Sequence, residues 1–192
     1  HSAVIALGGN SISNDLAMMA QVSIDEAEEI KTKYGSAKAA MASTDLEFEL
    51  PYSAGETPRK SSEHEVSRYV EARMTEIFQM VKQETQKRLQ LSPWRSGIEK
   101  PVPFGVVLTG GGSLLKNAAS LGEEILDAQV KIGIPKGLSG VVDVAASPIY
   151  ATAIGLVQHP TLAHEQYDPV HQRSASMGKL VENIGGWFRG FF

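Results

Sequence analysis

A run of three glycines in the segment TGGGS, residues 109–113, is the strongest sign of chemistry in this sequence. The apolar residues GVVL precede the run and an amphipathic stretch follows it, which predicts a buried strand, a turn and a helix beginning near Ser113. Glycine lets the backbone approach a flat or anionic ligand, and a helix N-terminus offers free amide groups. Gly110, Gly111, Gly112 and Ser113 are therefore candidate ligand-binding residues, with a plain tight turn as the alternative.

Glu28 and Lys31 form a second candidate site. Ser23 and Glu26 have the spacing of a capping box, which predicts a helix running to about Tyr34. On that helix the spacing of three places the carboxylate and the ammonium on one face, where they could hold ribose hydroxyls and the edge of a base. The alternative is a solvated surface ion pair, which contributes only about 0.3–0.5 kcal/mol.

Gly9 lies in a third glycine turn. The apolar run AVIAL, residues 3–7, predicts a buried strand before it, and residues 11–20 predict a short helix after it. The turn either contacts a ligand or is a tight connection capped by Asn10. The sequence contains neither a Walker loop nor G-x-G-x-x-G, and it has no H-E-x-x-H or G-x-S-x-G motif, so no metal site and no nucleophilic serine are indicated.

The elements that must position these residues alternate between strands and helices, which predicts an α/β sheet. In the first half of the chain we also expect a half-buried strand over residues 45–50, a loop over 51–62 and a helix over 63–90. A boundary at 92–104 follows. In the second half we expect a strand over 129–134, a helix from Ser147 to about Val157 and a flexible polar linker over 158–178. The block 21–104 is interpreted as an α+β insertion into the sheet.

Composition is that of a globular protein. The chain has 192 residues, 42% of them hydrophobic, and its net charge of −4 with scattered Lys and Arg disfavours nucleic-acid binding. The absence of cysteine excludes disulfides and thiolate metal sites. No apolar run approaches the ~18 residues of a spanning helix. Because the sequence opens without methionine or a signal-peptide pattern, we interpret it as a piece of a longer protein.

The aromatic ending VENIGGWFRGFF is unusual for such a chain. Placed on a helix from Lys179, this segment has an apolar stripe made of Leu180, Ile184, Trp187, Phe188 and Phe191. The terminal Phe192 adds to its apolar character. Residues 179–192 are therefore predicted to be a membrane-targeting helix that lies on anionic lipid and folds there. A terminal helix packed on the core is the alternative.

The segments IALGGNSISNDLA, DEAEEIKTKYGSA, VEARMTEIFQMVKQE, VVLTGGGSLLKN and SPIYATAIGLV, in this order, resemble the second half of the FtsA family of bacterial cell-division proteins, in the actin and heat-shock ATPase superfamily. The resemblance implies an α/β, actin-like (ribonuclease H-like) second lobe, with a mixed sheet, flanking helices and an inserted α+β subdomain. Residues 1–20 and 105–157 would form the large nucleotide-binding subdomain, and residues 21–104 the smaller one.

The resemblance also implies a cofactor, ATP with Mg²⁺. Its adenosine would be held by Gly9, Glu28, Lys31 and the loop from Gly110 to Ser113. The family's phosphate-binding loops and its metal-associated acidic residue lie before the point where this chain begins. Most contacts to ATP would therefore come from residues absent from this chain.

The implied function is that of a scaffold which attaches filaments of the tubulin homologue FtsZ to the cytoplasmic side of the cell membrane at the division site. The implied partners are the FtsZ C-terminal peptide, further copies of the protein in actin-like filaments, other divisome proteins of the septum and anionic lipid. Arg73 matches an arginine implicated in peptide binding, although an ion pair with Glu76 is an equal alternative. The protein would not be an enzyme, beyond a weak ATPase activity in its intact form.

Two other functions share this fold. A kinase of the sugar or acetate kinase type also uses a glycine-rich adenosine loop, but it has no need of a detachable aromatic terminus. A bacterial actin-like scaffold of the rod-shape or pilus type is the other alternative, and the linker followed by a terminal helix weighs against it.

Overall fold

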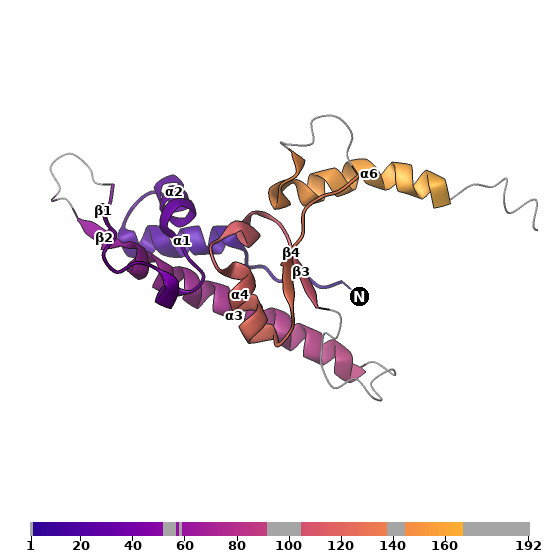
Figure 1. Cartoon of the computed structure of the whole chain (residues 1–192), viewed down its shortest axis with the longest axis horizontal. Coiled ribbons are helices and arrows are strands. Elements are labelled where there is room, and N and C mark those ends of the chain that lie inside the picture. The colour runs from indigo at the N-terminus through magenta and orange to yellow at the C-terminus, as the bar shows by residue number, and fades with distance from the viewer. Residues whose placement is uncertain (1, 52–56, 58, 92–104, 138–144, 167–192) are drawn as a thin grey trace, which may run out of the picture. The chain divides into compact units, whose positions relative to one another are not determined.

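The computed structural model of the chain describes residues 2–51, 57, 59–91, 105–137 and 145–166 (Figure 1). The chain divides into two compact units, residues 1–151 and 152–192, and each is described by itself. The first unit holds every strand and most of the helices in the described part of the chain. The predicted division into a larger and a smaller subdomain stays a prediction.

Helices α1 (Gly9–Ala20) and α2 (Ile24–Tyr34) open the first unit. The capping box predicted for α2 is confirmed, because the Ser23 backbone amide donates to Glu26 Oε2 at 2.8 Å and Ser23 Oγ accepts from the Glu26 amide at 3.3 Å. Gly35 follows the last helical residue, as expected. Local signals at both ends therefore set the length of α2.

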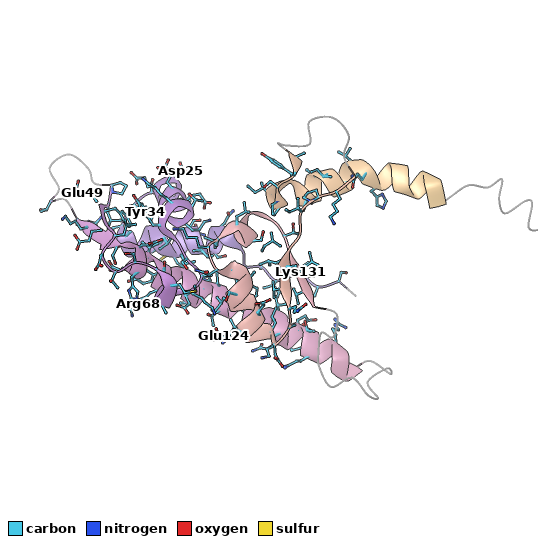
Figure 2. All side chains as sticks on the ribbon, viewed as in Figure 1. Asp25, Tyr34, Glu49, Arg68, Glu124 and Lys131 are labelled. Carbon is cyan, nitrogen blue, oxygen red and sulfur yellow. The ribbon has the colours of Figure 1, made fainter. Side chains whose placement is uncertain are left out.

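A short hairpin follows, in which β1 (Glu47–Glu49) pairs antiparallel with β2 (Lys60–Ser62). The predicted strand at 45–50 is confirmed at its centre. The predicted loop at 51–62 is wrong at its end, because β2 finds hydrogen-bond partners in β1, with Phe48 opposite Ser61. The Phe48 ring stacks on Tyr34 of α2 at 3.8 Å between centroids; Tyr34 is labelled in Figure 2.

The glycine run lies between the two strands of a parallel pair. Strand β3 (Val106–Leu108) pairs with β4 (Val130–Ile132), and the connection holds the 3₁₀ turn η2 (Gly111–Leu114) and helix α4 (Ala118–Leu126). A parallel pair requires such a crossover. Another 3₁₀ turn, η1 (Ala39–Met41), is tied to α4 by an ion pair between Lys38 and Glu124 at 3.0 Å; Glu124 is labelled in Figure 2.

Two further predictions in this unit are wrong. The helix expected near Ser113 begins at Ala118, because residues 111–114 form a 3₁₀ turn and Asn117 adopts the left-handed conformation, with φ of 61°. The strand expected at 3–7 does not form, and Val4 is 96% exposed. A strand needs a hydrogen-bonded neighbour, and within the described residues β3 and β4 pair with each other and not with this segment.

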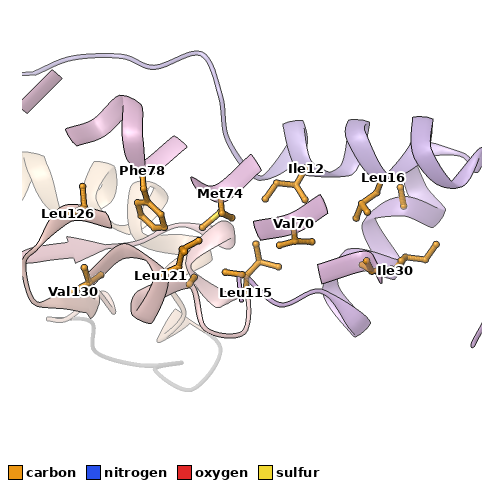
Figure 3. Close-up of a cluster of buried hydrophobic side chains, with 14 of the residues drawn as sticks. Ile12, Leu16, Ile30, Val70, Met74, Phe78, Leu115, Leu121, Leu126 and Val130 are labelled. Atoms are coloured by element: carbon orange, nitrogen blue, oxygen red, sulfur yellow. The ribbon is translucent and has the colours of Figure 1, made fainter. Parts of the chain in front are cut away.

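Helix α3 (Glu63–Leu91) is the long helix that the spacing of three and four predicted, and it organises the core (Figure 3). One of its faces carries Val66, Val70, Met74 and Phe78, all buried. This stripe packs against side chains of α1 and α2 toward its N-terminal end and of α4 toward its C-terminal end. The remaining buried hydrophobic residues of this core are Ile12, Leu16, Ala27, Ile30, Ala37, Leu50, Leu115, Ala118, Leu121, Leu126 and Val130.

The predicted helix start at Ser147 is confirmed. Ser147 Oγ accepts from the Ile149 amide at 3.4 Å, and the 3₁₀ turn η3 (Pro148–Tyr150) leads into helix α6 (Ala151–Gln166). The helix continues to Gln166 instead of stopping near Val157, so the first part of the predicted linker is helical. The boundary at 92–104 and the rest of the linker lie outside the described residues.

Candidate functional site

A cavity of about 490 Å³ in the first unit is lined by segments that are far apart in the sequence. The start of α1 contributes Gly9, one face of α2 contributes Glu28 and Lys31, and η2 contributes Gly111 and Gly112. The structure therefore brings together five of the seven residues that the glycine turns and the E-x-x-K spacing singled out. A volume of this size lies in the ~300–1,000 Å³ range of small-molecule sites.

Lys31 is buried, and its ammonium is fully occupied by the protein. Lys31 Nζ donates to the Gly9 carbonyl oxygen at 3.1 Å, to Ser13 Oγ at 2.9 Å and to Glu28 Oε2 at 2.5 Å. An ammonium has three donors, and these contacts use all three. In this structure the contacts of Lys31 join α1 to α2, and the prediction that Lys31 also holds ribose hydroxyls stays a prediction.

Glu28 is about half exposed, and its ionised form is stabilised. Partial burial raises the pKa of the Glu28 carboxyl, but hydrogen bonds from Lys31 and Ser13 and the charge of Lys31 outweigh that effect and lower the pKa overall. Glu28 is therefore charged at neutral pH. An ionised carboxylate accepts hydrogen bonds from hydroxyl groups, which is the chemistry that an adenosine ribose requires.

The glycine loop is shaped differently from the helix start that was expected. Gly110 has φ of +85°, a conformation that favours glycine, and the turn that follows places Gly111 and Gly112 at the cavity. Ser113 is buried, and both its amide and its hydroxyl donate to the Gly110 carbonyl oxygen, at 3.1 and 2.7 Å. Gly110 and Ser113 therefore shape the loop, and neither is among the residues that line the cavity.

Side chains that the sequence reasoning did not single out complete the cavity: Asn10, Thr32, Leu114, Leu115, Lys116 and Ile149. Asn10 and Thr32 are adjacent in sequence to predicted residues and could have been found from that proximity. Ile149 comes from η3, about 35 residues after the glycine loop, and only the fold brings it near Gly111, where a Cβ would lie 3.9 Å from Ile149 Cγ1. No local sequence signal marks it.

Arg73, the candidate partner residue, lies on α3 against α1. Its guanidinium binds Asp15 through two hydrogen bonds, at 2.6 and 2.8 Å, and Glu76 through a third at 2.5 Å. The ion pair with Glu76 was the alternative stated from the sequence, whereas the pairing with Asp15, 58 positions away, was missed. The hydrogen bonds with Asp15 are the largest of the effects that raise the pKa of Arg73 above its ordinary value. The guanidinium is therefore permanently charged.

Two cavities that share lining residues lie on this side of α3, and the cluster lines the first of them. One, of about 310 Å³, is lined by Asp15, Met18, Met19, Tyr69, Ala72, Arg73 and Glu76. The other, of about 400 Å³, shares Met19 and Tyr69 with it and continues over Leu16, Ile30, Val66 and the hairpin. Met18 and Met19 are 80% and 53% exposed. Together the two cavities form a partly apolar groove along α3, which we call the α3 groove.

The predicted membrane residues, from Leu180 to Phe192, lie outside the described residues. Among the described residues, no helix is long and apolar enough to cross a membrane. In the same part of the chain, no group of three or more His, Cys, Asp or Glu side chains is gathered as a metal site would require.

Comparison with known proteins gives the family. The family model described as "Cell division protein FtsA" matches residues 1–155. The chain belongs to the FtsA family. The FtsA protein of Pseudomonas aeruginosa is 36% identical over 159 residues, which are 83% of this chain and 36% of that protein. The FtsA protein of Escherichia coli K12 is 30% identical over 98% of this chain and 45% of that protein. The FtsA protein of Neisseria meningitidis is 32% identical over 100% of this chain and 46% of that protein.

Solved structures give the fold of this FtsA-family chain. MreB5 of Spiroplasma citri bound to ADP matches with a TM-score of 0.57 and 17% identity, over 82% of this chain and 46% of that one. The same protein bound to AMPPNP matches with a TM-score of 0.55 and 17% identity, over 84% of this chain and 46% of that one. The chain therefore has an actin-like fold of the α/β class, and it spans less than half the length of the curated FtsA relatives quoted above.

Proposed function

We propose that this FtsA-family chain is the nucleotide-binding and partner-binding part of an actin-like cell-division scaffold that attaches FtsZ filaments to the cytoplasmic side of the membrane. The observation that carries the proposal is the 490 Å³ cavity, where three segments marked independently in the sequence converge. Membership of the FtsA family favours this scaffold over a kinase or a rod-shape protein of the same fold.

The cofactor of the proposal is ATP with Mg²⁺, and the cavity fits its adenosine part. Glu28 supplies an ionised acceptor for ribose hydroxyls. Gly112 lines the cavity, and a Cβ on it would meet no atom within 4 Å, so the backbone there is open to a ligand. The phosphates and Mg²⁺ would be held mostly by residues outside this chain. Bound ATP would stabilise the folded state, because a ligand that binds only the folded state shifts the equilibrium toward it.

The experiment is titration of a fluorescent ATP analogue into the chain and two alanine variants. Gly112→Ala adds a methyl group at the cavity without a clash and is expected to weaken binding about tenfold, the lower end of the range for one added carbon in a binding pocket. Gly155→Ala is the matched control, because its added Cβ also meets open space but lies on α6. The adenosine part is proposed to bind residues of this chain, so weak but measurable binding by the wild type is expected. Equal affinity for the wild type and Gly112→Ala, or no binding by the wild type, would contradict the proposal.

The partner of the proposal is the C-terminal peptide of FtsZ, bound in the α3 groove. Exposed methionine side chains adapt to an apolar partner surface, and Met18 and Met19 lie beside the Arg73 cluster. A carboxylate of the peptide would take the place of Glu76 on the guanidinium, because Asp15 holds Arg73 through two hydrogen bonds and Glu76 through one.

Fluorescence anisotropy with a labelled FtsZ C-terminal peptide tests this partner site. Arg73→Ala is expected to weaken binding about tenfold or more, the value of a charge-assisted hydrogen bond. Arg88→Ala on the same helix removes a pair with Glu84 at 3.2 Å, leaves the residues that line the α3 groove unchanged, and should bind as the wild type does. Glu76→Gln should strengthen binding by freeing part of the guanidinium. Unchanged binding by a folded Arg73→Ala variant would refute the site.

The remaining parts of the proposal rest on the family and on the C-terminal sequence. The scaffold would assemble head to tail into actin-like filaments, an open type of association, and would meet other divisome proteins at the septum. Residues 179–192 would anchor it to anionic lipid as a peripheral membrane protein. It would act as a scaffold and not as an enzyme, with at most weak ATPase activity in the intact protein.

A further inference from the structure

Ser13 lies behind the nucleotide cavity and was not singled out by any sequence motif. It is on α1, one turn after Gly9, and is only 2% exposed. Its hydroxyl accepts a hydrogen bond from Lys31 Nζ at 2.9 Å. Its proton has two acceptors in reach, the closer Glu28 Oε2 and the Gly9 carbonyl oxygen at 3.3 Å. A buried hydroxyl thus connects both charged residues of the E-x-x-K pair to the helix that begins at the cavity.

The hydrogen-bond count explains why a hydroxyl suits this position. Lys31 has three donors and no acceptor, and Glu28 when ionised has acceptors only. Ser13 can accept from the ammonium and donate to the carboxylate at the same time, because a hydroxyl does both. An alanine would leave one Lys31 donor and one Glu28 contact unmade in a buried place, which is costly.

We propose that Ser13 is a positioning residue of this cavity, which orients the Glu28 carboxylate and the Lys31 ammonium for an adenosine nucleotide. The inference rests on the proposed nucleotide site. Both Ser13 and Lys31 bind Glu28 through Oε2, so these two contacts hold the carboxylate by one oxygen, on a residue that lines the cavity. Lys31 also holds the Gly9 carbonyl, so the same contacts fix the start of α1.

A second buried serine provides the contrast. Ser67 on α3 is 0% exposed and its Oγ accepts from the Ser36 amide at 3.1 Å, yet it does not line the cavity. Loss of the Ser67 hydroxyl should therefore affect the free energy of unfolding without affecting Glu28. Loss of the Ser13 hydroxyl should affect Glu28 directly.

The experiment compares Ser13→Ala, Ser13→Thr and Ser67→Ala with the wild type in the full chain, using two measurements. The first is the pKa of the Glu28 carboxyl, followed by carbon NMR in the absence of nucleotide. The second is the affinity for a fluorescent ADP analogue. Ser13→Ala is expected to raise the Glu28 pKa and to weaken nucleotide binding about tenfold, the effect of one lost hydrogen bond to a charged group. Ser13→Thr should retain the wild-type pKa, and so should Ser67→Ala.

Each result decides a different point. A Glu28 pKa that is unchanged in folded Ser13→Ala would overturn the positioning role, whether or not nucleotide binds. The same pKa increase in Ser67→Ala would also overturn it, because the effect would then be one of general destabilisation. If the wild type binds no nucleotide while Ser13→Ala raises the Glu28 pKa, the nucleotide assignment fails and the positioning of Glu28 stands.

Discussion

At the scale of single residues, Lys31 and Arg73, the two cations predicted as site residues, are both bound by acidic or polar groups of the protein. Lys31 is 5% exposed and binds Gly9, Ser13 and Glu28. A buried charge is tolerated only when it is paired and hydrogen-bonded, and Lys31 meets this condition. The residue therefore contributes to stability as well as to the candidate site.

Substitution of Lys31 by methionine should lower the free energy of unfolding by about 1–3 kcal/mol, because it leaves polar partners without a hydrogen bond in a partly buried place. Urea unfolding at neutral pH measures this change. Lys33→Met on the same helix is the control, since Lys33 is exposed and should change stability little. Equal losses for the two variants would contradict the role given to Lys31.

A second prediction at this scale concerns acid stability. Hydrogen bonds from Lys116 Nζ and from the Ser43 amide lower the pKa of Glu63. As the pH falls, the unfolded chain therefore binds a proton at Glu63 at a higher pH than the folded chain does. Stability should fall as the pH falls from about 4.3, the ordinary value for Glu, through the lower folded pKa.

Urea unfolding between pH 7 and pH 3 checks this slope. Glu63→Gln should be less stable than the wild type at pH 7 and should lose less stability across the acidic range. Glu47→Gln, which removes an exposed ion pair with Lys60, should keep the wild-type slope. A slope that does not change in Glu63→Gln would show that Glu63 is not responsible.

At the scale of elements, α3 packs against α1, α2, α4 and η1 of the first unit. Its buried face recurs every four residues, from Val66 to Phe78, which is the pattern of an amphipathic helix. Its N-terminal part packs on α1 and α2 and its C-terminal part on α4. The helix that carries Arg73 is thus also the helix on which the candidate nucleotide cavity depends, because α1 and α2 line that cavity.

Phe78→Ala should destabilise the first unit by about 3–5 kcal/mol, the cost of removing a buried phenylalanine. The ring is 3% exposed and lies close to Gly122 of α4, where an added Cβ would come within 3.1 Å of it. Thermal or urea unfolding measures the loss. Met80→Ala on the same helix should cost much less, because Met80 is 37% exposed. A small loss for Phe78→Ala would show that α4 does not pack as described.

At the scale of the whole molecule, the chain combines an actin-like first unit with a C-terminal part that begins in α6. The helices described have no span long and apolar enough to cross a membrane. The proposed attachment to lipid rests on the sequence of residues 179–192, where the predicted apolar stripe is rich in aromatic residues and only two cations occur. Aromatic insertion should then contribute more to lipid binding than charge does.

Co-sedimentation with vesicles that contain phosphatidylglycerol tests this expectation. Trp187→Glu should release the protein into the supernatant, because it places a charge in the apolar stripe, whereas Arg189→Ala should reduce binding only slightly. Deletion of residues 179–192 should abolish sedimentation. Binding that survives the deletion would refute the membrane anchor, and greater release by Arg189→Ala would refute the dominance of aromatic insertion.

Much of the fold could be predicted because its signals are local. The capping box at Ser23, the stop at Gly35 and the cap at Ser147 each satisfy backbone groups of neighbouring residues. The strand at residues 3–7 and the helix start at Ser113 could not be predicted correctly. A strand depends on a neighbour that the described chain does not provide, and the glycine loop closes on itself through the Gly110 carbonyl oxygen.

By itself, the sequence determined which residue types were available for binding and where most helices begin and end. It marked Gly9, Glu28 and the glycine run as separate candidates, and only the family resemblance implied that they hold one ligand. Only the tertiary structure decided that they share one cavity, that Ser13 lies between the charged pair, and that Asp15 holds Arg73. The physical reason is separation along the sequence. Capping depends on atoms a few residues apart, whereas burial and hydrogen-bond partners depend on distant segments that folding brings together.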